Sequence, residues 1–424
     1  MSEIVDPRTT RGLSHRRIRM VARDPEESHR AATPLELLFD LTFVVAIGIA
    51  SNELAHLLAE GHVASGLGAF AFAMFAICWA WINFSWFASA YDTDDWFYRI
   101  TTMVQMIGVI VLALGLPTVF ASLDEGEHLD NAIVVAGYVI MRVAMVAQWL
   151  RAAREDPARR SVSLTYAGFI ILAQVGWTIT AILDLSVATV LLVAPLLYLV
   201  ELAGPVIAEQ RFGRTAWHPH HIAERYALFT IIALGEGVIG TVVSVSAVID
   251  EQGWSSEAIL LVIAGTGLTF GLWWNYFVLP SGRVLARYRE RSWAWGYGHM
   301  VIFASIAATG AGLHVAAYVI EGVAHIGVLG AVLSVAVPVL ICCAALFVLY
   351  SLLLREFDPF HVALFVGTVL VLALAVVMAA AGVSMGVCLL VVMVAPAVVV
   401  VGYEVLGYRH QEAVLTRILG EPAE

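Results

Sequence analysis

Long apolar runs separated by short polar connections constrain the fold of this chain more than any other feature. A helix needs about 20 apolar residues to cross a bilayer, and backbone groups in lipid must pair within the segment. Charged residues make up only 13% of the chain, against about 25% in a soluble domain. The chain is therefore predicted to be an all-α, polytopic helical membrane bundle. Its twelve predicted spans lie near residues 35–58, 65–90, 98–120, 131–151, 162–182, 187–207, 221–247, 257–279, 293–317, 325–354, 360–382 and 384–407.

The arginines alternate along the connections between these runs. Connections after even-numbered runs hold Arg99, Arg151, Arg211, Arg283 and Arg355, among others, whereas connections after odd-numbered runs hold none. Loops rich in arginine stay on the cytoplasmic side of a membrane. The alternation supports the count of twelve and predicts a multi-pass protein of the bacterial inner membrane with both termini in the cytoplasm.

The predicted domain boundaries follow from these runs. The first segment is rich in arginine, lacks apolar periodicity and is predicted to be a disordered cytoplasmic tail. The segments are a basic tail over 1–30, a first six-helix half over 31–207, a cytoplasmic linker over 208–220, a second six-helix half over 221–408 and a C-terminal cytoplasmic tail over 409–424.

Similar sequences near the starts of the two halves predict a 6+6 internal repeat. Glu36 and Glu224 each precede a threonine by six residues, and Trp81-Ile-Asn83-Phe is matched by Trp273-Trp-Asn275-Tyr. A repeat with an even number of spans keeps its orientation in the membrane. The two halves are therefore expected to be related by an axis along the membrane normal.

Two charged residues are predicted to lie near the middle of the membrane. Glu236 follows the membrane entry near Tyr226 by about 15 Å of helix, and Arg142 lies at a similar depth in the fourth run. Charges in hydrocarbon are costly unless they are paired, and each of these is the expected partner of the other. The pair is either a substrate or ion site or an ion pair that stabilises the bundle.

Further charged residues are expected at the cytoplasmic entry. Thr33-Pro34-Leu35-Glu36 is a capping box with proline in the first turn, which explains Glu36 but not Asp40 one turn later. His221 and Arg225 share a helix face with Glu236. Arg225 is expected to point inward and to pair with Asp40. Glu224 is either part of the same polar gate or a solvated helix start.

The remaining candidates have plausible structural roles as well as functional ones. His299 is either a hydrogen-bonded core residue or part of the pathway, and Asn83 and Asn275 are expected to hydrogen-bond across helices. A cluster of three aspartates either forms a solvated cap with Arg99 or attracts cations. Its members, Asp92, Asp94 and Asp95, are weak metal candidates. No P-loop or zinc motif is present, and no cofactor is expected.

The block that begins at Thr33 and contains Glu36 and Asp40 resembles the bacterial low temperature requirement A (LtrA) family. His221-Ile-Ala-Glu224-Arg225, the following Leu-Gly-Glu236, the Trp-Trp-Asn275-Tyr-Phe block and Gly-His299 strengthen the resemblance. It covers roughly residues 31–405. It implies a bacterial membrane protein named for a growth phenotype in the cold, and it supplies no substrate or reaction.

The charge pattern favours a secondary transporter or an ion-conducting protein driven by a proton or sodium gradient. One alternative is a membrane-embedded enzyme that acts on lipid or isoprenoid groups through the aspartate cluster. The other is a non-catalytic scaffold. The expected partners are membrane lipids and a solute or ion, with no nucleic acid. The sequence does not fix the oligomeric state, and a homodimer is one option.

Overall fold

The computed structural model describes residues 15–27, 30–355 and 359–419. Over these residues twelve helices are long and apolar enough to cross a membrane, which confirms the predicted all-α membrane bundle. The helices are α1 (Pro34–Glu60), α2 (Val63–Tyr91), α3 (Trp96–Glu125), α4 (Ala132–Glu155), α5 (Arg160–Ile182), α6 (Val187–Phe212), α7 (Pro219–Gln252), α8 (Ser256–Phe277), α9 (Ser281–Arg287), α10 (Ser292–Ile320), α11 (Val328–Leu354), α12 (Pro359–Ala380), α13 (Met385–Gly402) and α14 (Tyr408–Leu419).

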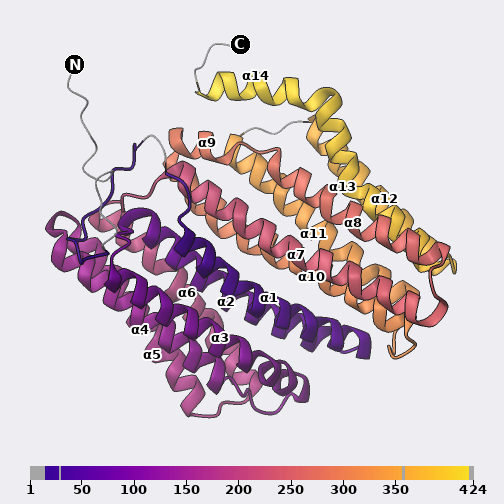
Figure 1. Cartoon of the computed structure of the whole chain (residues 1–424), viewed down its shortest axis with the longest axis horizontal. Helices are drawn as coiled ribbons and strands as arrows, with labels where there is room; N and C mark the ends of the chain where they lie inside the picture. The colour runs from indigo at the N-terminus through magenta and orange to yellow at the C-terminus, as the bar shows by residue number, and fades with distance from the viewer. Residues whose placement is uncertain (1–14, 28–29, 356–358, 420–424) are drawn as a thin grey trace.

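The long helices form two groups that meet along α1, α7 and α10 (Figure 1). Helices α1 to α6 lie on one side and α7 to α13 on the other. The first helix of each group packs against the second and third: α1 contacts α2 and α3, and α7 contacts α8 and α10. Across the boundary α1 packs on α7 and α10, so side chains on its inner face reach the second group.

The segment before α1 packs against the end of the bundle at which α1 and α7 begin, called the entry end below. Met20 is fully buried, and its backbone N–H donates to Glu155 at 2.6 Å. The N–H of Ile18 donates to Asp95 at 3.1 Å. Residues 15–27 therefore differ from the predicted disordered tail, because carboxylates at the helix ends bind their backbone amides. Residues 1–14 lie outside the described part of the chain.

Two short helices at the entry end were not predicted. The first, α9, follows α8, and α14 occupies most of the predicted C-terminal tail. Val414 and Leu415 of α14 are buried, whereas Arg409 and Arg417 are exposed. Both helices are too short or too polar to resemble spans, which explains why a search for apolar runs missed them. The linker between the halves is also shorter than predicted, since α6 continues to Phe212.

Candidate functional site

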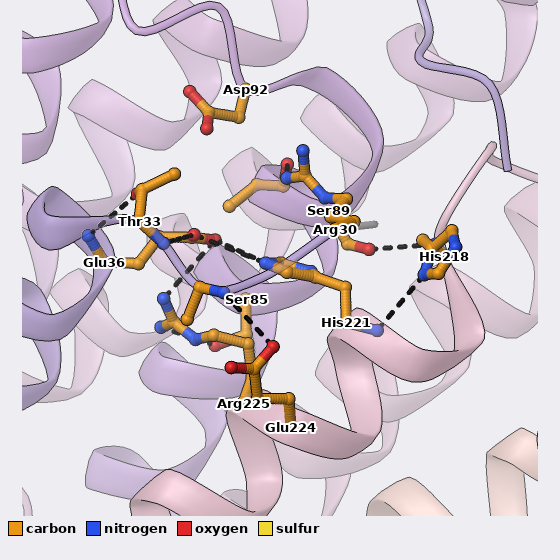
Figure 2. Close-up of polar contacts among 12 residues, drawn as sticks. Arg30, Thr33, Glu36, Ser85, Ser89, Asp92, His218, His221, Glu224 and Arg225 are labelled. Carbon is orange, nitrogen blue, oxygen red and sulfur yellow. Dashed lines mark hydrogen bonds and ion pairs between the residues drawn. The ribbon is translucent and has the colours of Figure 1, made fainter. Parts of the chain in front are cut away.

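Five side chains from α1, α7 and the segment before α1 form a buried polar cluster at the entry end. Figure 2 shows Arg30, Glu36, His221 and Arg225 of this cluster. The entry cluster comprises Arg30, Glu36, Asp40, His221 and Arg225. Glu36 is in place because of the capping box: Thr33 accepts from the N–H of Glu36, and the Glu36 carboxylate accepts from the N–H of Thr33 at 2.8 Å. This confirms the predicted helix start and leaves the other oxygen of Glu36 directed at α7.

Arg225 links the two carboxylates of the entry cluster. Its guanidinium donates to Asp40 at 2.6 Å and lies 3.3 Å from Glu36. The side chains of all three residues are fully buried. The predicted pairing of Arg225 with Asp40 is thus confirmed. Trp81 of α2 also donates to Asp40, at 2.7 Å, so the cluster joins three helices across the boundary between the two groups.

His221 completes the entry cluster on the side of α7. Its Nε2 lies 3.2 Å from Glu36, and its side chain is fully buried. The preceding turn is held by His218, whose Nδ1 accepts from the N–H of His221 at 3.2 Å. Burial lowers the pKa of His218, which favours the neutral ring that this cap requires. Glu224 is half-buried and accepts from the N–H of Ala32 at 3.2 Å.

Arg30 is the member of the entry cluster that comes from the segment before α1, and Asp92 lies beside the cluster in the connection after α2. Arg30 donates to the carbonyl of Ala88 at 2.8 Å, and burial lowers its pKa. Burial, and then the charge of Glu36, raises the pKa of Asp92 to about 6. In Figure 2 the Asp92 carboxylate lies apart from the ion-paired groups. Glu36, whose charge helps to raise the pKa of Asp92, is a member of the entry cluster. Asp92 itself lies outside the network of direct contacts.

An aromatic layer lies between the entry cluster and the middle of the bundle. This aromatic plug consists of Phe43, Trp81, Phe229 and Phe303, which are all at most 1% exposed. Trp81 stacks on Phe229 with ring centroids 4.2 Å apart, and Phe303 meets Phe229 at 4.8 Å. These close ring contacts fill the space between α1, α2, α7 and α10 at this level.

Glu236 lies beyond the aromatic plug and has no hydrogen bond or ion pair with any described residue, although it is only 2% exposed. A Cβ atom added to Gly48 of α1 would lie 3.3 Å from its Oε1, so that glycine leaves room for the carboxylate. A Cβ atom added to Gly310 of α10 would lie 2.6 Å from the Glu236 backbone, so α7 and α10 cross closely here. Three helices thus surround an unpaired acid.

The predicted pairing of Arg142 with Glu236 is wrong. Arg142 pairs instead with Glu201 of α6, at 3.3 Å, and donates to Tyr138 at 2.6 Å. Trp79 donates to the same Glu201 oxygen at 2.6 Å. The prediction matched the two charges by depth alone, whereas α4 packs against α3 and α5 on the side of the bundle away from α7. Arg142 and Glu236 therefore belong to separate sites.

The other residues that were predicted to line the pathway lie apart from the entry cluster and from Glu236. They are His299, Asn83 and Asn275. His299 is held between the carbonyl of Trp295, at 2.7 Å, and the hydroxyl of Tyr276, at 2.9 Å, as expected for a core histidine. Asn83 donates to Trp79 of its own helix, not across helices as predicted. Asn83 and Asn275 line cavities of about 30 and 70 Å³, one in each half. Such volumes hold water but are too small for a solute.

The three aspartates after α2 do not act as one group. Asp94 pairs with Arg99 at 2.8 Å, as the solvated-cap interpretation expected. Asp95 caps α3 and binds Arg151 at 3.0 Å. Asp92 accepts from the N–H of Asp94 at 2.9 Å. No cluster of three or more His, Cys, Asp or Glu residues that could hold a metal ion occurs in the described ranges.

Sequence reasoning missed Glu201 as the partner of Arg142, Arg30 as a member of the entry cluster, and Gln174 as a buried polar side chain of α5. Glu201 and Gln174 are single polar residues inside apolar runs, and that signal was available. Arg30 lies among the arginines of the predicted tail, where nothing in the sequence distinguishes it from its solvated neighbours. Trp81 was recognised as part of the repeat signature, but its hydrogen bond to Asp40 depends on how α1 packs against α2.

Comparisons with known proteins agree with the membrane architecture. The model of a family described as bacterial low temperature requirement A protein matches residues 31–396. An uncharacterized protein of Rhizobium meliloti (strain 1021) is 27% identical over 301 residues, which cover 65% of this chain and 67% of that protein. No solved structure matches the chain.

Proposed function

Because this multi-pass membrane protein belongs to the bacterial low temperature requirement A (LtrA) family, whose name specifies no reaction, we propose its function from the buried site: it is a secondary transporter coupled to protons or sodium ions. Glu236 is the coupling carboxylate. The entry cluster and the aromatic plug form the gate on the side where α1 and α7 begin.

The unpaired state of Glu236 is the observation that supports this proposal. An isolated ionised carboxylate in an apolar interior is very unfavourable, so the group carries a proton or a bound cation whenever it is sealed from water. Exchange of that proton or cation requires contact with water. A carboxylate at the boundary of two helix groups reaches water when the groups move relative to each other, as alternating access requires.

The aromatic plug supports a gate at the entry end. Phe43 and Phe229 precede Gly48 and Glu236 along α1 and α7, so their rings lie between the carboxylate and the entry cluster. In the proposed mechanism these packed rings close the route from the entry end to Glu236 in this conformation. We infer that separation of α1 from α7 opens it, with the ion pairs of the entry cluster stabilising the closed state.

The proposal includes the six-plus-six repeat and the orientation in the inner membrane. Trp149 stacks on Tyr166 between α4 and α5, and Tyr350 stacks on His361 between α11 and α12, at corresponding places in the two groups. Both ring pairs line the cavities that contain Asn83 and Asn275. The arginines gather at the entry end, which supports a cytoplasmic location for this end and for both termini.

The alternative of a membrane-embedded enzyme rested on the cluster of three aspartates after α2. Asp92, Asp94 and Asp95 bind separate partners, so they offer no shared site for a metal and a phosphate. The scaffold alternative remains as an outcome of the test below. The link to growth at low temperature remains a prediction drawn from the family name.

The test measures charge movement in proteoliposomes on a solid-supported membrane. Purified protein is exposed to steps in proton or sodium concentration without any added solute. We expect wild-type protein to give a transient current on one of these steps, because a coupling ion binds part of the way across the membrane. The Glu236→Gln protein is expected to give none.

Glu125→Gln is the matched control, since Glu125 is an exposed carboxylate at the end of α3. It should keep the wild-type current. Each protein is first checked for a monodisperse size-exclusion profile. A full current from well-folded Glu236→Gln protein would show that Glu236 is not the coupling group. A wild-type protein that responds to neither ion would support the scaffold and refute the transporter.

A further inference from the structure

One face of α1 is exposed along its whole length, and it changes from apolar to polar between the two ends of the bundle. Its exposed residues in the half nearer the entry end are all apolar, including Leu37, Leu38, Leu41 and Val45. Its exposed residues in the other half, nearer the opposite or far end, are Asn52 and His56. Lipid solvates the first set well, whereas the polar second set favours contact with water or with a polar partner.

Glu53, next to Asn52, is an unpaired acid within the membrane span. It is half-buried and has no hydrogen bond or ion pair with any described residue. The span was predicted over residues 35–58, so Glu53 lies about 8 Å inside its far boundary. Acidic side chains at such a depth face a polar partner or a water-filled cavity, because lipid does not solvate them. Without a partner in the described chain, Glu53 favours a water-filled approach from the far end.

Tyr318 of α10 adds a polar group from a second helix to this approach. Its hydroxyl donates to Oδ1 of Asn52 at 3.5 Å. The Glu53 carboxylate is near enough to interact electrostatically with the same tyrosine. Ser51, the residue before Asn52, donates to the carbonyl of Ala307 at 3.4 Å, so α1 and α10 are in contact here. Polar side chains of α1 and α10 therefore meet in the far half of the bundle.

Glu236 lies next to the point at which α1 changes from apolar to polar. A Cβ atom added to Gly48 would lie 3.3 Å from Glu236 Oε1, and Gly48 is itself half-exposed. The oxygens of Glu236 have no partner among the described residues, yet neither is among the polar atoms with almost no accessible area. Gly48 and Asn52 are one helix turn apart on the same face of α1. The carboxylate therefore keeps a small accessible area beside the face of α1 that carries Asn52.

We propose that Asn52, Glu53 and Tyr318 form the far half of the ion pathway, through which Glu236 exchanges its proton or sodium ion with the far end. This pathway rests on the coupling role proposed for Glu236 and adds the side from which the ion arrives. Glu53 attracts the cation. Cations and water bind to oxygen atoms, and Asn52 and Tyr318 offer an amide and a hydroxyl oxygen beside that carboxylate. With the aromatic plug on its other side, Glu236 exchanges ions with the far end alone in this conformation.

The first test measures the reaction of single cysteines with a charged, membrane-impermeant methanethiosulfonate reagent, added to one side of reconstituted vesicles at a time. The native cysteines are buried and give the background. Asn52→Cys should react from the far end only, because the reactive thiolate forms in water. Val45→Cys, on the apolar half of the same face, should not react. Exposed marker cysteines, His325→Cys at the far end and Arg154→Cys at the entry end, identify the two sides.

The second test measures the transient current of the same vesicles. Modification of Asn52→Cys from the far end should abolish the current, whereas the same treatment of Val45→Cys should not. Glu53→Gln should slow the current about tenfold, because the charge that concentrates cations in the pathway is lost. Glu125→Gln, at an exposed carboxylate of the same end, should keep the wild-type rate.

The two measurements separate this pathway from the coupling role of Glu236. If wild type gives a current and Asn52→Cys is as unreactive as Val45→Cys, the far pathway is wrong and the proposed function stands. Reaction of Asn52→Cys from the entry end would also overturn the pathway. If Asn52→Cys reacts from the far end but wild type gives no current, water fills the approach, and the coupling role of Glu236 fails together with the ion pathway.

Discussion

Helices α1 and α7 bury acidic side chains in two places, and the two places are built in opposite ways. At the entry cluster Glu36 and Asp40 share Arg225, and His221 lies 3.2 Å from Glu36. Glu236, about 16 Å further along α7, faces a glycine and has no partner among the described residues. The same helix boundary thus holds one ion-paired group and one isolated acid.

The difference separates a structural role from a functional one. Paired buried charges hold three helices together, and removal of one partner leaves an uncompensated charge behind. An isolated acid contributes no such contact, so selection for packing alone would favour an apolar residue at Glu236. We therefore expect changes at the entry cluster to alter stability first and changes at Glu236 to alter ion binding first.

The largest expected effect is a loss of stability, and it tests the entry cluster. Arg225→Met should destabilise the protein by about 3–5 kcal/mol, because two carboxylates lose their shared cation. Unfolding midpoints in detergent measure this effect. The double change Arg225→Met with Asp40→Leu should recover much of the loss, and Arg99→Met, in the exposed pair with Asp94, should cost at most about 1 kcal/mol. If Arg225→Met unfolds like Arg99→Met, the entry cluster does not stabilise the helix boundary.

An intermediate effect tests the surroundings of the isolated acid. Gly310→Ala should destabilise the bundle by about 1–3 kcal/mol, because the added methyl group would overlap the α7 backbone at Glu236. Gly48→Ala meets only the flexible end of the Glu236 side chain and should cost less. Thermal unfolding followed by size-exclusion chromatography measures both.

Gly168→Ala serves as the control for these glycine changes. No atom lies within 4 Å of the position of its added Cβ, and alanine favours the helix, so its stability should be unchanged or raised. An equal loss for Gly310→Ala and Gly48→Ala would mean that the close crossing of α7 and α10 is not what positions Glu236.

The smallest expected effect concerns pH and the cap of α7. Burial lowers the pKa of His218 below its usual value of about 6.5, so the folded protein binds this proton less readily than the unfolded chain does. The stability from the neutral cap is complete above about pH 6.5 and is lost as the pH falls through the folded pKa. His218→Asn keeps a cap acceptor and removes the titrating group.

Thermal midpoints should therefore fall less for His218→Asn than for wild type as the pH drops from about 7.5 to about 5.5. His325→Asn, at an exposed position on the opposite end of the bundle, is the control and should follow wild type. If the thermal midpoints of wild type and His218→Asn change in parallel with pH, the His218 cap does not contribute to the acid sensitivity of the protein.

The sequence alone determined the depth and helical position of the key residues. Apolar runs fixed the twelve spans, because a helix must cover the bilayer thickness with apolar side chains. The capping box at Thr33 and Glu36 was also readable, because its contacts lie within four residues of each other. Pairing of Arg225 with Asp40 followed from the chemistry of two opposite charges at the same membrane entry.

The tertiary structure decided which helices are neighbours. Arg142 lay at a depth that suited Glu236, but its partner is Glu201, because α4 and α6 belong to the same helix group. The aromatic plug likewise arises from contacts between distant segments, since its rings come from α1, α2, α7 and α10. A rise of 1.5 Å per residue fixes how deep a side chain lies. Only packing between helices fixes what it faces, which is why Glu236 is alone and Arg142 is not.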